Sequence, residues 1–277
     1  MMCSCRCVAL WNAICASLIL YSCSTAPVPQ QGTPAFFWSA ARETFAARDY
    51  MKTIDHLENV GPGSEYSKRA QAWLLVLTSG LADGFMQLAE HYEAGAMANK
   101  ASPTPFRQQV AMLRRYANRM SLSFAEKFNK FQQIKDETIE LDFPFPGGSA
   151  TLGPTLAKIS SGIMPPAPEV ESIQKRALER GVLLATCRAA GAPDDPAKAQ
   201  ELFKKAPVQV PRAVLITAMA NVLFEQAQLY APRKLDDPEK LRIFCVAAQD
   251  ALKTIPESKQ TKELNSKIQA ALKRAKV

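Results

Sequence analysis

VAMLRRYANRMSLSFAEKFNKF, residues 110–131, is the stretch that decides the fold class of this chain. Its apolar side chains recur in steps of three and four residues, which places them on one face of an α-helix. These positions are Val110, Leu113, Ala117, Met120, Phe124, Phe128 and Phe131. Such an aromatic face can line a ligand groove, but it more often packs against neighbouring helices. We therefore interpret it as core.

The same signals continue on both sides of this helix. A capping residue followed by proline is typical of a helix start and occurs at Thr33-Pro34, Thr104-Pro105, Asp195-Pro196 and Asp237-Pro238. Residues 214–224 are apolar almost all round, as in a helix enclosed by others. Strand-like alternation is nearly absent, so the sequence predicts an all-α protein. The expected helices are 34–48, 50–60, 64–80, 81–98, 105–138, 169–190, 196–205, 211–230, 238–254 and 258–275.

One segment interrupts the helices. Residues 141–168 are rich in proline and glycine, yet they also carry apolar side chains such as Leu156 and Ile159. Loops longer than about 12–15 residues are usually functional or disordered. This one either packs across the helices, contacts a partner, or acts as a hinge between two lobes. We expect helical regions at 34–140 and 169–277 on either side of it.

The chain also contains features of helical repeats. Asp194-Asp195-Pro196 and Asp236-Asp237-Pro238 are offset by 42 residues, and the same offset relates Leu202 to Phe244 and Ala206 to Ala248. Such a period is typical of stacked helix pairs, although two similar caps can also arise by coincidence.

The first two expected helices resemble a tetratricopeptide repeat. The matching positions are Phe37, Ala41, Asp49-Tyr50, Leu57 and Gly61-Pro62. Arg48 replaces the glycine of the repeat's turn, and Thr53 replaces its small alanine. The resemblance covers about residues 34–98 if residues 70–95 form a second helix pair. It implies an α-solenoid with a concave surface that binds peptides or protein segments.

The N-terminus has the features of an export signal. Residues 8–21 form an apolar run whose length suits a signal peptide and is too short for a membrane-spanning helix. The run ends in Leu20-Tyr21-Ser22-Cys23, which resembles the lipobox of bacterial lipoproteins. That resemblance implies a signal peptide at 1–22, a covalent lipid on Cys23, and a tether at 23–33. Ser24 after the cysteine implies the outer membrane, and an ordinary signal peptide with incidental cysteines is the alternative.

Net charge gives a weaker indication. The formal charge of +8 becomes +7 without residues 1–22, where Arg6 is the one charged side chain. This excess suits a protein near anionic lipid or acidic partners. Lys and Arg are spread over most of the expected helices rather than gathered on one face, so we do not expect nucleic-acid binding.

Candidate chemical groups are few. Cys187 and Cys245 lie in apolar helical stretches, and we favour two buried thiols over a disulfide. The two histidines, His56 and His91, provide too little for a metal site or a triad, and His91 is expected at a helix surface or interface. We expect no cofactor other than the covalent lipid.

One motif suggests an enzyme. Gly84-Phe85-Met86-Gln87 resembles a segment of lytic transglycosylases, which cleave peptidoglycan. That family requires a catalytic Glu-Ser about fifteen residues earlier, where this chain has Lys68-Arg69-Ala70. We predict that the protein is not an enzyme and assign no catalytic residue.

These observations favour an envelope lipoprotein whose helices bind other envelope proteins or peptides. A binding module for an apolar small ligand, enclosed by the long loop and the Phe124, Phe128 and Phe131 face, is the alternative. A divergent cell-wall enzyme ranks third.

Overall fold

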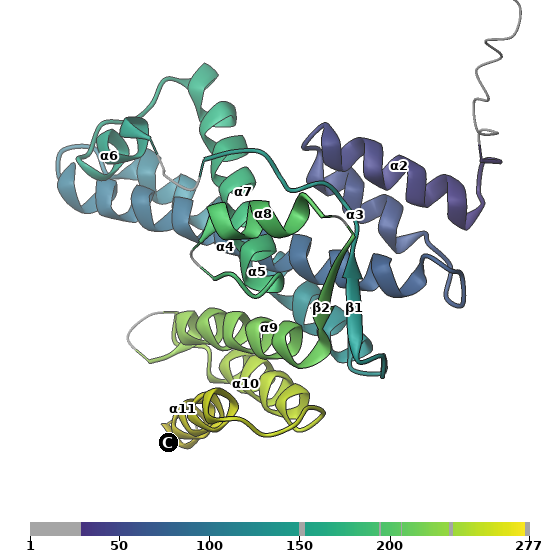
Figure 1. Cartoon of the computed structure of the whole chain (residues 1–277). Coiled ribbons are helices and arrows are strands. Elements are labelled where there is room, and N and C mark those ends of the chain that lie inside the picture. The colour runs from purple at the N-terminus through teal and green to yellow at the C-terminus, as the bar shows by residue number, and fades with distance from the viewer. Residues whose placement is uncertain (1–28, 150–152, 194, 206, 233–234, 275–277) are drawn as a thin grey trace, which may run out of the picture.

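The computed structural model describes residues 29–149, 153–193, 195–205, 207–232 and 235–274. These residues are mostly helical, so the predicted all-α class is confirmed (Figure 1). The elements are α2 (Pro34–Ala46), α3 (Tyr50–Glu58), α4 (Ser67–Ala98), α5 (Thr104–Phe131), β1 (Thr138–Leu141), α6 (Pro154–Ser160), α7 (Ala167–Ala189), α8 (Pro196–Phe203), β2 (Val208–Pro211), α9 (Arg212–Ala227), the 3₁₀ turn η1 (Gln228–Tyr230), α10 (Pro238–Leu252) and α11 (Lys259–Arg274).

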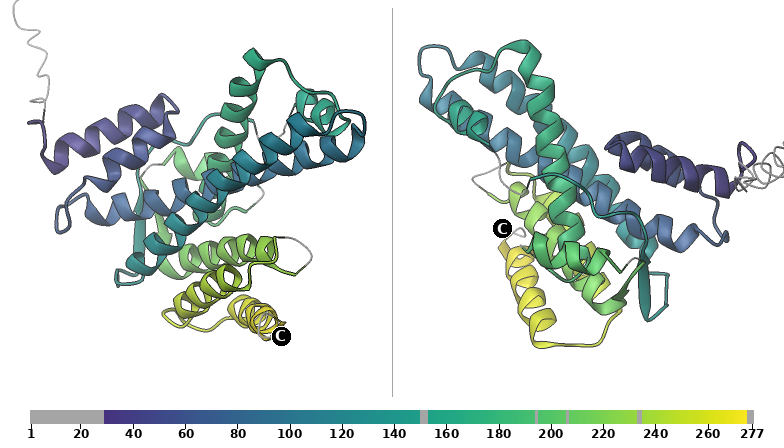
Figure 2. Two further views of the ribbon diagram at one scale, coloured as in Figure 1. Left: turned by 180° about the vertical axis from the view of Figure 1, so that it is seen from behind. Right: turned by 45° about the horizontal axis from the view of Figure 1, so that its top comes forward.

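Helix α4 is the centre of the molecule. It packs along α5 and α7, as Figure 2 shows from two sides. Nearly all of its middle turns are buried. It is long and apolar enough to cross a membrane, but 89% of its most apolar window is buried by the rest of the protein. Such a sequence is expected for a central core helix.

The prediction of two helices at 64–80 and 81–98 was wrong, because residues 67–98 form one continuous helix. The supposed second repeat unit at residues 70–95 therefore lies within a single helix. The buried hydroxyls of Thr78 and Ser79 are satisfied within this helix, because they donate to the carbonyls of Leu74 and Val76 in the preceding turn.

Glycines bring α4 and α7 into backbone contact. A Cβ added at Gly80 would lie 2.7 Å from the Cα of Val182, and one at Gly84 would lie 2.8 Å from the carbonyl oxygen of Ala177. A Cβ at Gly181 would collide with the carbonyl oxygen of Gly80. The Gly-Phe-Met-Gln motif thus lies at a helix crossing, and its Gln87 accepts a hydrogen bond from Arg180 of α7.

The aromatic face of α5 is core, as predicted, with Phe124, Phe128 and Phe131 fully buried. The helix ends at Phe131 rather than 138, however, and β1 follows. Strand β1 pairs antiparallel with β2, with Ile139 opposite Val210. Ile139 and Leu141 are buried while their neighbours are more exposed. Four-residue strands are too short for alternation to reveal them in a sequence.

The described part of segment 141–168 packs on the helices. The ring of Phe143 stacks on Trp73 at 4.7 Å between centroids and also contacts Trp38 and Phe45. Helix α6 adds the buried side chains of Leu156 and Ile159. One hydrophobic core consequently includes residues from α2 to α11.

The second half of the chain ends in a stack of α9, α10 and α11 (Figure 1). Asp195 and Asp237 cap α8 and α10 through the backbone amides of Lys198 and Lys240, as their sequences predict. Residues related by the 42-residue offset do not pack in the same way. Leu202 is 37% exposed, whereas its counterpart Phe244 is fully buried.

The two cysteines behave as predicted. Cys187 and Cys245 are buried and not joined to each other by a disulfide. They belong to separate hydrophobic clusters. Burial raises the pKa of Cys245 to about 11, as expected for a thiol that serves as core.

Candidate functional site

The predicted lipidation residue, Cys23, and the apolar run before it lie outside the described residues, as does Ala206 of the supposed repeat. The functional surfaces of the described chain must therefore be found from its geometry. No cluster of three or more metal-binding side chains occurs within that part of the chain.

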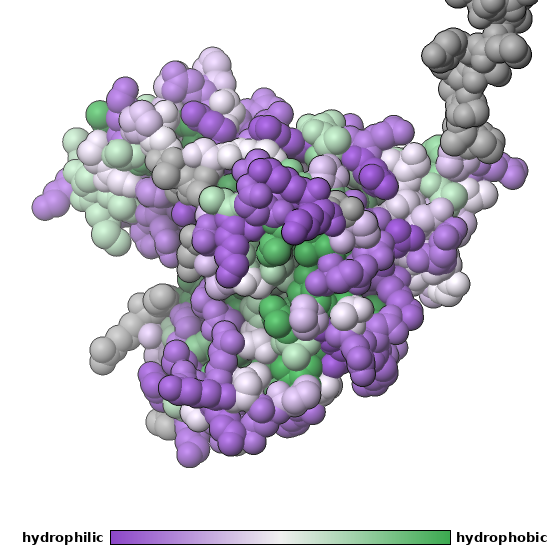
Figure 3. All heavy atoms as spheres, viewed as in Figure 1, coloured by the Kyte–Doolittle hydropathy of each residue, from purple (hydrophilic) through white to green (hydrophobic). Residues whose placement is uncertain are grey.

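The largest of the principal cavities in the described structure is a groove of about 650 Å³ beside α9. Helix α9 supplies one wall, the turn after α7 a second, and the start of α11 with the residues before it a third. We call it the α9 groove, and its lining includes Gly191, Pro193, Val214, Thr217, Ala218, Asn221, Pro256 and Gln260. Figure 3 shows hydrophobic residues, in green, at the surface between α7–α8 and α9.

The lining of the α9 groove alternates apolar and hydrogen-bonding groups. Val214 and Ala218 provide apolar surface one turn apart, and Thr217 and Asn221 follow the same spacing with polar groups. Prolines form part of the other walls. A mixture of this kind suits an extended polypeptide, whose side chains alternate and whose backbone carries donors and acceptors.

This groove corrects one sequence expectation. Residues 214–224 were predicted to be enclosed on all sides, but Val214 is 39% exposed and faces open space. The polar positions Thr217, Asn221 and Glu225, spaced by four, were the available signal. They mark a less apolar stripe on an otherwise apolar helix.

One end of the groove is formed by an ion-pair network. Arg188 of α7 donates to Asp83 of α4 at 2.9 Å and lies 3.5 Å from Glu225 of α9. The amide of Gln226 donates to the other carboxylate oxygen of Asp83 at 3.1 Å. Both Asp83 oxygens are thus engaged, and the network fixes the place of Arg188.

Asp83 is the buried carboxyl of this network. Burial raises its pKa to about 6, although Arg188 and the Gln226 hydrogen bond act in the opposite direction. Perturbed groups often mark functional sites, but structural ion pairs produce them as well. With both oxygens bonded to protein, Asp83 serves to position Arg188 and to join α4, α7 and α9.

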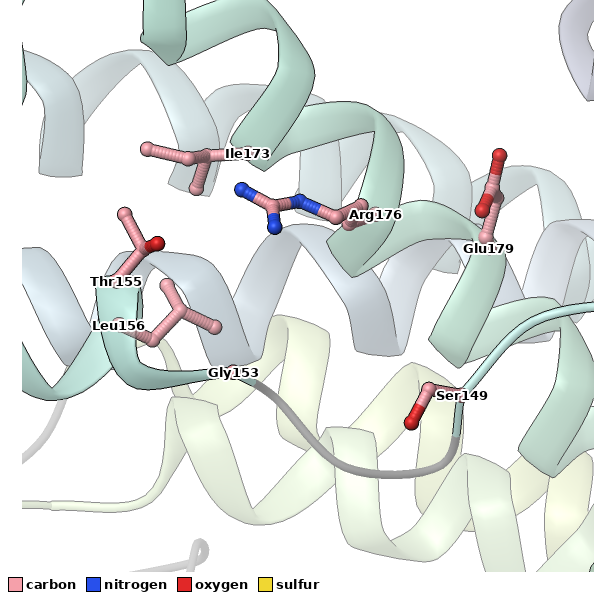
Figure 4. A pocket seen from close by; sticks show the side chains of 7 residues that line it. All are labelled: Ser149, Gly153, Thr155, Leu156, Ile173, Arg176 and Glu179. Atoms are coloured by element: carbon pink, nitrogen blue, oxygen red, sulfur yellow. The ribbon is translucent and has the colours of Figure 1, made fainter.

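A smaller pocket of about 150 Å³ lies between α6 and α7 (Figure 4). Ile173 and Arg176 come from α7, Thr155 and Leu156 come from α6, and Ser149 comes from the preceding segment. The guanidinium of Arg176 points toward Thr155, whereas the Glu179 carboxylate turns away from it. Glu179 pairs with Arg48 at 3.2 Å. The pocket therefore combines one basic side chain with a carboxylate that already has a structural partner.

The other residues singled out from sequence are dispersed. His91 lies at a helix interface, as predicted, with its Nδ1 2.8 Å from the Ser160 hydroxyl of α6. Burial lowers the pKa of His91. The fully buried side chains of Phe124, Phe128 and Phe131 do not line any of the cavities described above. In the described structure these three side chains therefore belong to the core.

The function of this chain is inferred from these surfaces rather than from relatives. No family model matches the chain, and no curated protein or solved structure shows significant similarity to it.

Proposed function

We propose that this protein is a lipid-anchored adaptor of the bacterial envelope that binds a segment of another envelope protein in the α9 groove. The observation that carries the proposal is the groove itself, with its alternating apolar and polar lining. Its volume falls within the 300–1,000 Å³ typical of ligand sites. Its open form suits a chain segment better than an enclosed small molecule.

The anchor belongs to the same proposal. Cys23, in its lipobox-like context, carries the lipid on its sulfur in this proposal, and the outer membrane facing the periplasm is the expected location. A turn closed by the hydrogen bond from the Thr33 amide to the Gln30 carbonyl precedes α2, and the seven residues 23–29 before it would span at most about 23 Å if fully extended at about 3.3 Å per residue. That reach allows the helical body to stand clear of the membrane surface while remaining attached to it.

The tetratricopeptide-like part of the proposal now rests on one helix pair. Helices α2 and α3 pack on each other and are joined by a turn in which Arg48 has a φ of 61°. That backbone region favours glycine, which the repeat family has at this position. The α2–α3 pair therefore supports a single degenerate unit rather than an array.

A photoreactive amino acid in place of Val214, in the full chain within intact envelopes, tests the groove. Ile243 on α10 is the matched control, because both are β-branched and their exposed fractions are 39% and 41%. We expect a discrete crosslinked protein from position 214 and none from position 243. The groove assignment would be overturned by identical products at both positions or by no product at position 214.

Lipid labelling tests the anchor separately. We expect radiolabelled fatty acid to be incorporated into the wild-type chain and not into Cys23→Ala. Incorporation that persists in Cys23→Ala would refute lipidation at this residue. That result would leave the groove experiment unaffected.

A further inference from the structure

The two most exposed large apolar side chains in the described structure lie at the C-terminal end of α4. Met97, in the last turn of α4, is 69% exposed, and Ile163, after α6, is 57% exposed. Exposed large apolar side chains that gather at one place mark interaction sites more often than scattered ones do. We call this end of the molecule, with its surrounding basic residues Lys100, Arg107 and Lys158, the tip.

Hydrogen bonds and close packing join the two chain segments of the tip. Asn99 joins its two chain segments, because its amide donates to the carbonyl of Gly162 at 3.0 Å and its side-chain oxygen accepts from the Ser102 amide at 2.9 Å. Gly162 has a φ of +89° and lies against Asn99 and Ala98. Gly95 admits the Phe106 ring, which a Cβ would approach to 2.7 Å. These contacts hold Met97 and Ile163 on neighbouring segments at a fixed end of the protein.

The charge around the tip has one sign. The sequence contains no Asp or Glu from residue 94 to 125, nor from 143 to 168. Lys100, Arg107 and Lys158 are exposed, and none has an ion-pair partner among the described residues. The nearest acidic residues along α4 are Glu90 and Glu93, and Glu93 is paired with Arg114 at 2.7 Å. The next acid after α6 is Glu169, on α7.

We propose that the tip binds an anionic lipid surface, with Met97 and Ile163 entering the headgroup region and Lys100, Arg107 and Lys158 contacting acidic headgroups. Peripheral membrane proteins combine these two contributions, apolar insertion and electrostatic attraction to anionic lipid. A nucleic acid or an acidic protein would account for the basic residues. It would leave the two exposed apolar side chains, Met97 and Ile163, without a role.

The position of the tip makes this a second membrane contact, distinct from the anchor. The start of α2 and the tip lie at opposite ends of the molecule in Figures 1 and 2. Helix α4, with 32 residues, extends over roughly 48 Å at 1.5 Å per residue. The tip is also separate from the α9 groove, so this inference does not depend on the proposed function.

An environment-sensitive fluorescent amino acid at position 97 reports on this contact locally. The full chain, as the cell makes it, is reconstituted with vesicles of phosphatidylcholine alone or of an equimolar mixture with phosphatidylglycerol. We expect a blue shift of the emission in the mixed vesicles and not in phosphatidylcholine. The same probe at Ile243 is the control and should not shift in either.

Charge variants complete the test. The exposed residues Lys100, Arg107 and Lys158 are each replaced by Gln. Each substitution should lower the equilibrium constant for insertion into the mixed vesicles roughly fivefold, as for a basic residue at an anionic surface. Circular dichroism would verify that the variants remain folded. An equal shift in both kinds of vesicle, no shift in either, or a shift with RNA or polyglutamate in the absence of vesicles would each overturn the proposal.

Discussion

Gly181 is the residue at which α4 and α7 come closest. A Cβ there would meet backbone atoms of Gly80, which cannot rotate away. We expect Gly181→Ala to lower the free energy of unfolding by about 1–3 kcal/mol, the usual cost of overpacking a core. The measurement is urea denaturation.

Gly61→Ala is the control for that substitution. A Cβ added at Gly61 would meet no atom within 4 Å, and this residue does not have a positive φ. Its replacement should change stability by no more than about 0.5 kcal/mol. Equal effects of the two substitutions would show that α4 and α7 are able to separate.

Asp83 should make stability depend on pH. Its pKa is about 6 in the folded protein and 3.8 when unperturbed, so between these values the folded state binds more protons than the unfolded state. Stability from this group is then highest below pH 4 and falls as pH rises toward 6, by on the order of 2 kcal/mol. Asp83→Asn should remove this slope, measured by urea denaturation from pH 4 to 7. Parallel pH profiles for the two proteins would contradict the assignment.

At the level of residues, the sequence allowed the core of α5 and the two buried thiols to be predicted. It did not allow the α9 groove to be predicted, because Gly191, Val214 and Gln260 are far apart in sequence. Their proximity depends on tertiary packing, which local periodicity does not encode. Met97 and Ile163 are likewise ordinary apolar residues until the end of α4 is seen to be exposed.

The start of helix α10 is stabilised by Asp237 and Pro238. Asp237 accepts a hydrogen bond from the Lys240 amide and precedes Pro238 at the first helical position. Replacement of Asp237 by Ala should reduce the free energy of unfolding by about 1 kcal/mol through loss of the cap. Asp250→Ala provides the comparison within the same helix, since Asp250 forms only an exposed pair with Lys253. Thermal denaturation showing an equal loss for both would argue against the cap.

Element boundaries were predicted where caps and prolines mark them. Helices α2, α8 and α10 begin at the expected residues. The break predicted near residue 80 was wrong because Gly80 serves close packing rather than a helix end. The strands were missed because β1 and β2 stabilise each other across a long separation in sequence.

Arg212 joins distant parts of the whole molecule. Its guanidinium, which is largely buried, donates to the carbonyls of Ile134 at 2.7 Å and Thr254 at 2.9 Å. We expect Arg212→Met to cost about 3 kcal/mol, because buried carbonyls lose a charged donor. Arg242→Met, on the exposed surface of α10, should have little effect.

The form of the Arg212→Met transition is also predicted. Because one core includes both Trp38 and Ile268, tryptophan fluorescence and far-UV circular dichroism should report a single shifted unfolding midpoint. Two separated midpoints would show that the helical regions on either side of residues 141–168 unfold independently.

The pairing of β1 with β2 has a consequence for biosynthesis. Val208 leaves the ribosome about seventy residues after Leu141, which corresponds to roughly 3–13 s at 5–20 residues per second. During that interval the edge of β1, with Ile139 and Leu141, has no partner strand. Until its second half is made, the nascent chain therefore exposes an unpaired apolar strand edge with which another chain can pair.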